Sequence, residues 1–373
     1  REGFLMRKYA KAGVDFKMER KIVEYFKKVS KRTKIRQVKE YEGYFANCFV
    51  YIFKGKRIIL AFGTDGPGSK PLVHEIFRRE VDIEKFRKDR NLSKKKIKEM
   101  LGCCGIDSVA MVVNDLLCVG AKPLTISNYV AWGRTDETIA GDIASGLKIG
   151  CKQAECMLIG GENATLGEMI KSCYDTCCTG MGIIENFKVL NGQMLKKDDV
   201  IIGLRSSGLH CNGISLARKT LIHYKPFGWK GIATIDEEIK ELGRTPAEII
   251  LTPTIIYKKP VYDGLLRNNI EVHAITNITG EGIWNFMRAL QNSRYGAELN
   301  FHKASPPQKE FLLIQKEARV SVREMYEVFN MGFGMYLVVP KKMSEKVLEA
   351  LNKFKIDNYK IKAEINGNIT AKH

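Results

Sequence analysis

Short apolar runs that lead directly into loops of small and polar residues recur in both halves of the chain. Residues 58–62 precede the loop 63–70, and residues 200–204 precede the loop 206–213. Apolar runs of this length, bounded by glycine, are typical of buried β-strands. Similar patterns predict further strands at residues 49–53, 157–159, 179–184 and 335–339.

Apolar residues at helical spacing lie between these runs and predict helices. In the first half the pattern predicts a basic amphipathic helix at 17–28 and helices at 106–118 and 138–153. In the second half it predicts helices from residue 214 onward and at 253–267, 282–290 and 344–354. The alternation of strands and helices indicates an α/β protein.

The length of 373 residues accommodates two domains of ordinary size. The best boundary is the segment 185–199, which contains an Asn-Gly pair and a cluster of lysine and aspartate residues. We therefore predict one domain at residues 1–187 and a second at residues 188–373.

A charged insert near residues 73–104 interrupts the first predicted domain. Sparse apolar residues among lysines and arginines predict a helical hairpin over residues 77–101, with a break and a cap at 91–93. The simpler interpretation is a solvated surface insert. The alternative is that its positive charge steers anionic substrates to a cleft.

The formal net charge of +19 is a large positive surplus. Such a surplus is typical of nucleic-acid-binding proteins, but it also attracts phosphorylated small molecules and keeps a protein in solution. No zinc-finger spacing, arginine–glycine repeat or aromatic RNA-binding motif accompanies it. The charge therefore favours a phosphorylated small-molecule substrate, and nucleic-acid binding is the minor alternative.

No apolar run approaches the roughly 18 residues that a membrane-spanning helix requires. The basic start of the chain also lacks the apolar core of a signal peptide. The ten cysteines lie in apolar or mixed surroundings, where reduced thiols are expected in a chain of this size without an export signal. These features predict a cytoplasmic protein with no membrane contact.

The glycine loops carry most of the candidate chemistry. Glycine at a strand end lets backbone N–H groups approach a ligand closely, and such groups suit phosphate. Candidate phosphate-binding residues in the second loop are Ser206, Ser207, Gly208 and Gly213. Thr279 and Gly280 open a predicted helix and form a further candidate anion site, which His273 and Asn277 flank.

Two aspartates, Asp65 and Asp115, each end a run of small or apolar residues. A buried charge there requires a cation or hydrogen-bond donors, and Mg²⁺ prefers a few carboxylate oxygens completed by water and phosphate. On the residues alone, a helix or turn cap is the simpler role for both. Lys70 ends the first glycine loop as a phosphate-binding lysine would, although the spacing is not that of a Walker motif.

His210 is one of six histidines and lies in a loop of small residues. Its imidazole could exchange a proton with a substrate amine or phosphate, or could bind phosphate only as a donor. Asn212 could orient a substrate amide. We predict catalytic roles for His210, Asn212 and Lys70.

Seven blocks in a fixed order resemble the phosphoribosylformylglycinamidine cyclo-ligase family, also called aminoimidazole ribonucleotide synthetases. The blocks are residues 9–15, 63–66, 105–116, 160–162, 206–213, 278–280 and 325–335. They extend over nearly the whole chain. The chain departs from the family pattern where Asn277 stands in place of a histidine and Glu281 interrupts a glycine run.

The resemblance implies an aminoimidazole ribonucleotide synthetase-like fold of class α/β (α+β) with two domains. The N-terminal ATP-binding domain would pair its mixed sheet with that of a second subunit in a homodimer, and the C-terminal α/β domain would bind substrate. ATP and Mg²⁺ are the implied cofactors, with Asp65 and Asp115 as metal ligands. The implied ATP-binding residues are Gly63, Thr64, Asp65, Gly66, Asn114, Asp115, Gly160, Gly161 and Glu162.

The implied reaction closes the ring of formylglycinamidine ribonucleotide in purine biosynthesis. Transfer of the γ-phosphoryl group to the formyl amide oxygen gives an iminophosphate, the amidine nitrogen attacks that carbon, and phosphate leaves. Positioning and charge stabilisation dominate such catalysis. Two alternatives stay open: a related ATP-dependent phosphotransferase or ligase of another small amide or acid, and a non-catalytic nucleic-acid-binding paralogue.

Overall fold

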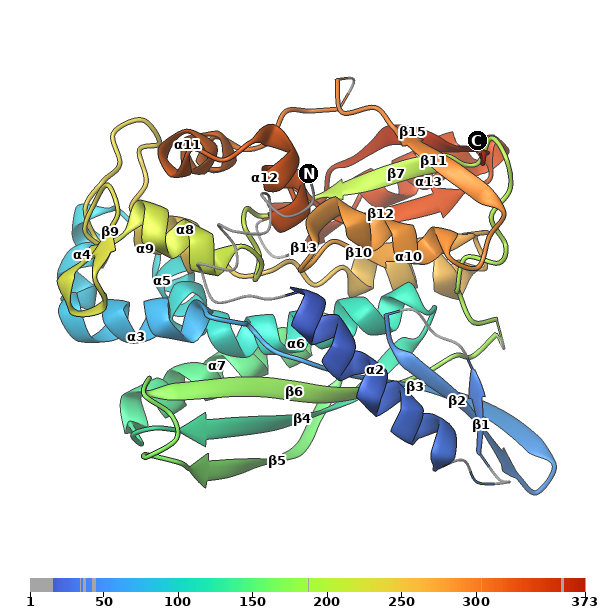
Figure 1. The fold of residues 1–373 in the computed structure, drawn as a ribbon, viewed down its shortest axis with the longest axis horizontal. Coiled ribbons are helices and arrows are strands. Elements are labelled where there is room, and N and C mark those ends of the chain that lie inside the picture. The colour runs from blue at the N-terminus through green and yellow to red at the C-terminus, as the bar shows by residue number, and fades with distance from the viewer. Residues whose placement is uncertain are drawn as a thin grey trace.

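The computed structural model describes residues 16–33, 35, 38–41, 45–186, 188–302, 304–356 and 359–372. The sequence block at 9–15 lies outside these residues. Within the described chain, a buried helix lies between two sheets, one from each half of the sequence (Figure 1). The predicted α/β class is confirmed.

The first sheet has six strands in the order β1-β2-β3-β6-β4-β5. Their bounds are β1 Val38–Tyr41, β2 Asn47–Phe53, β3 Lys56–Asp65, β4 Lys122–Trp132, β5 Met157–Thr165 and β6 Tyr174–Ile183. The pair β4 and β5 is parallel and the other neighbours are antiparallel. Along β3, Ile59 and Ala61 are buried whereas Thr64 is exposed, so one face packs on the core and the other is open.

Two helices, α6 Cys103–Cys118 and α7 Glu137–Ala154, cover the buried face of this sheet (Figure 1). Every residue of α6 except Asp115 is buried. Glycines let the two helices cross closely, because a Cβ at Gly105 would lie 2.3 Å from the carbonyl oxygen of Ile143. The predicted basic helix is also confirmed as α2 Phe16–Arg32.

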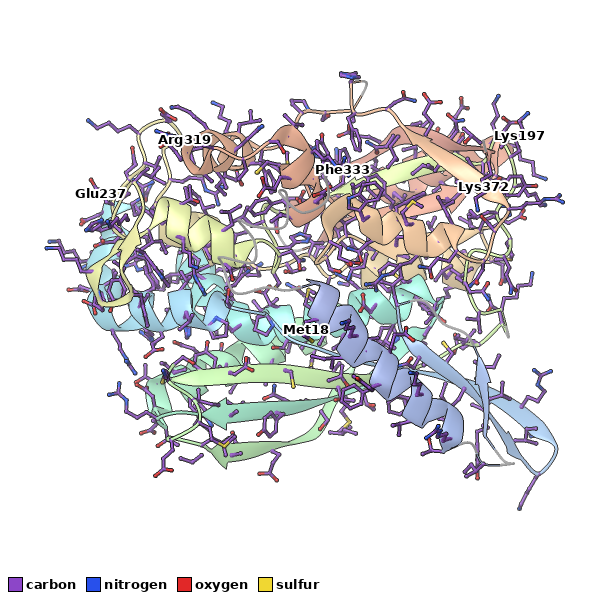
Figure 2. All side chains as sticks on the ribbon, viewed as in Figure 1. Met18, Lys197, Glu237, Arg319, Phe333 and Lys372 are labelled. Atoms are coloured by element: carbon purple, nitrogen blue, oxygen red, sulfur yellow. The ribbon has the colours of Figure 1, made fainter. Side chains whose placement is uncertain are left out.

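The second sheet is antiparallel and has five strands in the order β10-β12-β7-β15-β11. Their bounds are β7 Val200–Arg205, β10 Ala274–Asn277, β11 Tyr295–Leu299, β12 Phe333–Val339 and β15 Ala363–Ala371. All six residues of the central strand β7 are buried, as its unbroken apolar run predicts. Side chains fill the space around this sheet, where Phe333 is labelled in Figure 2.

The helices of the second half surround this sheet and the contact between the two halves (Figure 1). They are α8 Ile214–Leu221, α9 Pro246–Ile250, α10 Phe286–Leu290, α11 Lys309–Ala318, α12 Val322–Val328 and α13 Ser344–Asn352. Two short strand pairs complete the half, β8 His223–Tyr224 with β9 Trp229–Lys230 and β13 Lys355–Ile356 with β14 Tyr359–Lys360.

The helix predicted at 253–267 is wrong over most of its length. The chain is irregular up to Lys258 and then forms a single π-helical turn, Lys259–Asp263, and a 3-10 turn, Leu266–Asn268. Side chains of α6 bind the backbone of this segment: Asn114 donates to the carbonyl of Ile255 and accepts from the N–H of Tyr257. Contacts from a distant helix therefore replace the local helical hydrogen bonds.

The charged insert forms α3 Lys70–Glu80, α4 Ile83–Asp89 and α5 Lys94–Leu101. The predicted break and cap are confirmed, since the Ser93 hydroxyl accepts from the Lys96 N–H at 3.1 Å, but the first predicted helical run is divided at Val81 and Asp82. The solvated interpretation is wrong, however, because Phe86 and Met100 are buried. Arg90 also binds the second half, with bonds to Glu248 and to the carbonyl of Gly243.

Within the described chain, no single helix is long and apolar enough to cross a membrane. The helices α5 and α6 reach that length and composition only together, with a 68° bend between them, and α6 is a core helix. All ten cysteines are free thiols, as predicted. The cytoplasmic location stays a prediction.

Candidate active site between the two halves

The two predicted metal ligands lie near one another where β3 ends beside α6, close enough for their charges to interact. Asp65 is the last residue of β3, on the buried face, and one carboxylate oxygen accepts the N–H of Gly66 at 2.7 Å. Asp115 is the one residue of α6 that is not buried, and its carboxylate accepts from the side-chain amide of Asn277 at 2.9 Å. Because Asn277 ends β10, this hydrogen bond joins the first half of the chain to the second.

Electrostatics at this pair favour a bound cation. Burial raises the pKa of Asp65, which the Gly66 N–H and the charge of Arg288 partly oppose. Burial and the neighbouring Asp65 charge raise the pKa of Asp115 to about 7, against the opposing effects of Asn277 and Arg288. Two half-buried carboxylates that repel one another are stabilised by a divalent cation.

The donor set fits Mg²⁺. The described chain contains no group of three or more His, Cys, Asp or Glu residues that could hold a metal ion. A pair of carboxylates leaves the remaining positions to water and phosphate oxygens, which is the coordination that Mg²⁺ prefers. Asp65 and Asp115 would therefore hold the ion.

The predicted ATP ligand Asn114 has a different set of contacts. Its amide is buried and bonds to the backbone of Ile255 at 2.8 Å and of Tyr257 at 3.0 Å. Two turns earlier on α6, Asp107 accepts from the N–H of Thr254 at 2.7 Å. Both side chains hold the second half against α6, so Asn114 supports the site rather than facing it.

Lys70 is likewise not brought to the carboxylate pair. Its side chain is fully buried, and its ammonium group lies 2.7 Å from the carboxylate of Asp107 and donates to the carbonyl of Thr252 at 3.2 Å. Burial would lower the pKa of Lys70, but the Asp107 charge outweighs it and the pKa is raised. The structure therefore gives this lysine an interior ion pair within the first half, and its hydrogen bond to Thr252 joins that half to the second.

The second glycine loop is held rigidly by its own neighbours. The hydroxyl of Ser206 bonds to Asn330 at 3.1 Å, and that of Ser207 to the carbonyl of Pro253 at 2.7 Å. Gly208 and Gly213 both have positive φ, and a Cβ at Gly213 would lie 2.1 Å from the ring of Phe329. With both hydroxyls engaged, a ligand would meet backbone N–H groups here.

Asn212 joins this loop to the loop at residues 278–282. Its amide oxygen lies 3.9 Å from the point where a Cβ on Gly280 would stand. Its buried amide nitrogen has no hydrogen-bond partner among the described residues, which leaves one donor of this loop unsatisfied. The third loop is shaped by Asn285, whose amide donates to the carbonyls of Gly280 and Gly282, and Thr279 accepts from the N–H of Gly282.

His210 is buried within the second loop and has a positive φ of 57°. Its Nε2 accepts the N–H of Ser207 at 3.3 Å, so the ring is neutral in this arrangement. Burial and the charge of Lys70 lower its pKa to about 3. The imidazole thus has a structural role in the loop, and proton transfer to substrate stays a prediction.

We expect His210 to make the protein less stable as the pH falls. Its pKa is about 6.5 in the unfolded chain and about 3 in the folded one, so between these values only the unfolded chain binds the proton. The free energy of unfolding should decrease by up to about 1.4 kcal/mol per pH unit below pH 6.5. The variant His210→Asn keeps a residue that tolerates positive φ and removes this titration.

Urea unfolding of both proteins between pH 7.5 and 5.0 tests this. The wild type should lose about 2 kcal/mol more than His210→Asn over that range. Equal slopes for the two proteins would show that His210 is not protected from protonation. Other titrating groups, including the ion-paired His273, are common to both proteins and cancel.

Glu162 lies on the other face of the first sheet. The strand register pairs Asp65 with Cys178, Cys178 with Asn128, and Asn128 with Gly161. These four positions therefore lie on the same face of the sheet, the face that packs on the core. Glu162 follows Gly161 and therefore lies on the open face, exposed, where it accepts the Asn163 N–H. Thr64 shares that face and bonds to Thr179 at 2.9 Å. A single chain thus does not unite Glu162 with the two aspartates.

A separate cavity of about 570 Å³ lies away from these loops. It is lined by residues 193–196, Glu271, His273 and residues 292–295. His273 was predicted to flank the third loop, but it precedes β10 at the end opposite Asn277. It bonds to Asp199 at 2.6 Å and to Glu271 at 2.9 Å, which outweigh its burial and raise its pKa.

Comparison with known proteins identifies the family. A family model described as the C-terminal domain of AIR synthase related proteins matches residues 196–372, and the model of the N-terminal domain matches residues 91–184. A phosphoribosylformylglycinamidine cyclo-ligase of Pyrococcus horikoshii is 37% identical over 93% of this chain and 92% of its own. The chain belongs to the phosphoribosylformylglycinamidine cyclo-ligase family. Its counterpart from Carboxydothermus hydrogenoformans is 40% identical over 75% of this chain and 78% of its own.

Solved structures support the cyclo-ligase fold at low sequence identity. The hydrogenase maturation protein HypE in complex with ATP has a TM-score of 0.54 at 14% identity, over 84% of this chain and 77% of its own. A ThiL protein complexed with AMPPCP and TMP has a TM-score of 0.54 at 15% identity, over 94% and 90%. The aminoimidazole ribonucleotide synthetase-like architecture predicted from the sequence is confirmed.

Three residues near the carboxylate pair were not assigned a role at the site from the sequence. From the sequence, Asn277 stood out only as a departure from the family pattern and as a residue that flanks Thr279 and Gly280. Its amide nevertheless positions Asp115. Arg288 was not singled out, although its charge acts on both aspartates. The ring of Phe45 lies 5.1 Å beneath the Arg288 guanidinium. The sequence signal available for Arg288 was its position, one to two helical turns after a glycine loop.

Proposed function

We propose that this protein catalyses the ATP-dependent ring closure of formylglycinamidine ribonucleotide to aminoimidazole ribonucleotide. The observation that carries the proposal is the half-buried pair Asp65 and Asp115, which the Asn277 amide joins to the strand leading into the loop of Thr279 and Gly280. A carboxylate pair that binds a cation lies beside a loop suited to phosphate. Membership of the cyclo-ligase family supplies the substrate.

In this reaction the chain's own residues bind and orient the reactants. With Mg²⁺ bound, the ion would shield the negative charge of the ATP phosphates. Asn277 holds the Asp115 carboxylate in one orientation through its amide. The free amide N–H of Asn212 is the best candidate to bind the substrate amide whose oxygen accepts the phosphoryl group. The amidine nitrogen then attacks the activated carbon, phosphate departs and a proton is lost.

We also propose that the protein is a homodimer built through the open face of the first sheet. Large apolar side chains are exposed there, including Tyr51 and Tyr129, and Phe49 stacks on the half-buried Phe62. The edge strand β5 exposes Met157, Leu158 and Ile159. Pairing of this face with a second copy would bury these residues and would bring Glu162 against the partner. A monomer in sedimentation experiments would contradict this.

A direct assay tests the proposed activity. The protein is incubated with Mg-ATP and formylglycinamidine ribonucleotide, and ADP, phosphate and the imidazole product are measured together. We expect the three products in equal amounts, with none formed when Mg²⁺ is chelated. ATP consumption without imidazole would instead support a phosphotransferase or ligase with another substrate. Absence of ATP consumption would contradict the enzyme assignment.

A further inference from the structure

The C-terminal end of α7 places two cysteines against one another. The helix ends in a Schellman motif, in which Glu155 has a left-handed backbone with φ of 51°. The N–H of Glu155 donates to the carbonyl of Lys152 at 3.3 Å, and the N–H of Cys156 donates to the carbonyl of Cys151 at 3.1 Å. In this motif the residue after the left-handed position packs against the residue whose carbonyl it binds. Both of those residues are cysteines here.

The two thiols interact, and one of them is accessible to solvent. A hydrogen bond between them lowers the pKa of Cys151 and raises that of Cys156. The backbone bond between the same two residues keeps their Cα atoms near the separation of about 4.4–6.8 Å that a disulfide spans. Cys156 is half-buried whereas Cys151 is buried. A small oxidant can therefore reach Cys156, and the second thiol already lies beside it.

The other close thiols are shielded from solvent. The Sγ atoms of Cys103 and Cys104 lie 3.8 Å apart, but both residues are buried and adjacent in α6. Cys178 is also buried, and its sulfur accepts from the side-chain amide of Asn128 at 3.7 Å. Proximity alone does not make a thiol pair reactive, because the first step needs access for the oxidant.

We propose that Cys151 and Cys156 form a modification site, at which a peroxide produces a reversible disulfide in the folded protein. The Cys156 sulfur attacks one oxygen of hydrogen peroxide, the O–O bond breaks, and a sulfenic acid and one water form. The Cys151 sulfur then attacks the Cys156 sulfur, so that the S–S bond forms, the S–O bond breaks and a second water leaves. The two thiols lose two protons and two electrons, and the peroxide is reduced to water.

A disulfide at this position would tie α7 to the edge strand β5 of the first sheet (Figure 1). Cys156 immediately precedes Met157, where β5 begins. Between the two cysteines, Glu155 forms an ion pair with Lys258 of the second half. The new bond closes a short loop and restricts the unfolded chain, so oxidation should raise the melting temperature by roughly 3 °C.

The test treats the full chain with hydrogen peroxide, blocks the remaining thiols by alkylation and maps crosslinked peptides by mass spectrometry. Wild type is compared with Cys151→Ser, Cys156→Ser and the matched control Cys177→Ser, because Cys177 is also half-buried. Dimedone traps any sulfenic acid. Circular dichroism gives the melting temperature before oxidation, after oxidation and after reduction with dithiothreitol.

We expect wild type and Cys177→Ser to give a peptide crosslinked between Cys151 and Cys156, with the rise in melting temperature, and dithiothreitol to reverse both. Cys151→Ser should give no such crosslink and should accumulate the dimedone adduct at Cys156, because the resolving thiol is absent. Cys156→Ser should leave Cys151 as a thiol.

Three results would overturn the inference. In the first, wild-type Cys151 and Cys156 remain thiols while other cysteines of the folded chain are oxidised. In the second, Cys156 is crosslinked to Cys178 instead. In the third, the expected crosslink forms only after the protein is unfolded in urea. The wild-type peptide map decides among these results even if a serine variant fails to fold.

Discussion

Asp115→Asn should remove almost all Mg-ATP-dependent turnover while the protein stays folded. The neutral amide keeps the size of the side chain but loses the charge that holds the ion, and Asp65→Asn should act in the same way. We expect kcat to fall about a hundredfold or more for either variant. The assay for imidazole product at saturating ATP and substrate measures this.

Stability should change in the opposite direction for Asp115→Asn. The pKa of Asp115 is about 7 in the folded protein, well above its value near 3.8 in the unfolded chain. Ionisation of this group therefore destabilises the metal-free fold as the pH rises from about 4 to 7. Because the amide does not ionise, metal-free Asp115→Asn should be at least as stable as wild type at pH 8, as measured by urea unfolding.

Asp175→Asn is the matched control. Asp175 lies exposed on β6, on the open face of the first sheet, and its carboxylate accepts the next backbone N–H at 2.8 Å, as that of Asp65 does. It is not part of the carboxylate pair, so its substitution should leave most of the turnover in place. Wild-type turnover in Asp65→Asn or Asp115→Asn at ordinary Mg²⁺ concentration would remove that residue from the metal site.

Lys70→Met should cost about 3 to 5 kcal/mol in the free energy of unfolding. The substitution fills the same space but leaves the Asp107 carboxylate buried without its cation. Lys70→Met combined with Asp107→Asn should recover much of this loss, because the asparagine oxygen can still accept the Thr254 N–H. Urea unfolding of the wild type, Lys70→Met, Asp107→Asn and the double variant completes a double-mutant cycle.

The stability of Lys70→Met, measured together with its affinity for ATP, distinguishes an interior ion pair from a phosphate-binding lysine. If Lys70 bound the ATP phosphates, Lys70→Met would remain stable and would lose affinity for ATP. A loss of stability below about 1 kcal/mol, together with a large rise in Kd for ATP, would contradict the ion-pair role.

Local sequence pattern predicted the strand that carries Asp65 and the helix that carries Asp115. The apolar run 58–62 became the middle of β3, and Asp65 ends that strand as its position after the run indicated. The strand β4 was missed because polar residues such as Ser127 and Asn128 interrupt its apolar pattern. Its position between β6 and β5 supplies hydrogen bonds on both sides, and that partnership has no local signal.

The roles of individual site residues depended on long-range contacts. Lys70 follows a glycine loop, but its partner Asp107 lies on another helix, so the ion pair could not be inferred locally. The face of Glu162 is set by the register of β4 and β5, which shifts between Ile126 and Ser127. Asn277 meets Asp115 only because β10 lies against α6, and no local pattern indicates that contact.

The buried contacts between α6 and the segment 252–258 have a consequence for how this protein unfolds. Asp107 and Asn114 satisfy backbone groups of Thr254, Ile255 and Tyr257 that have no helix of their own to pair with. Separation of the halves would leave those polar groups without partners and would expose the apolar surface of α6. We therefore expect the predicted boundary at 185–199 to divide two sheets without dividing two folding units. The chain should melt as one cooperative unit, with the active site lost in the same transition.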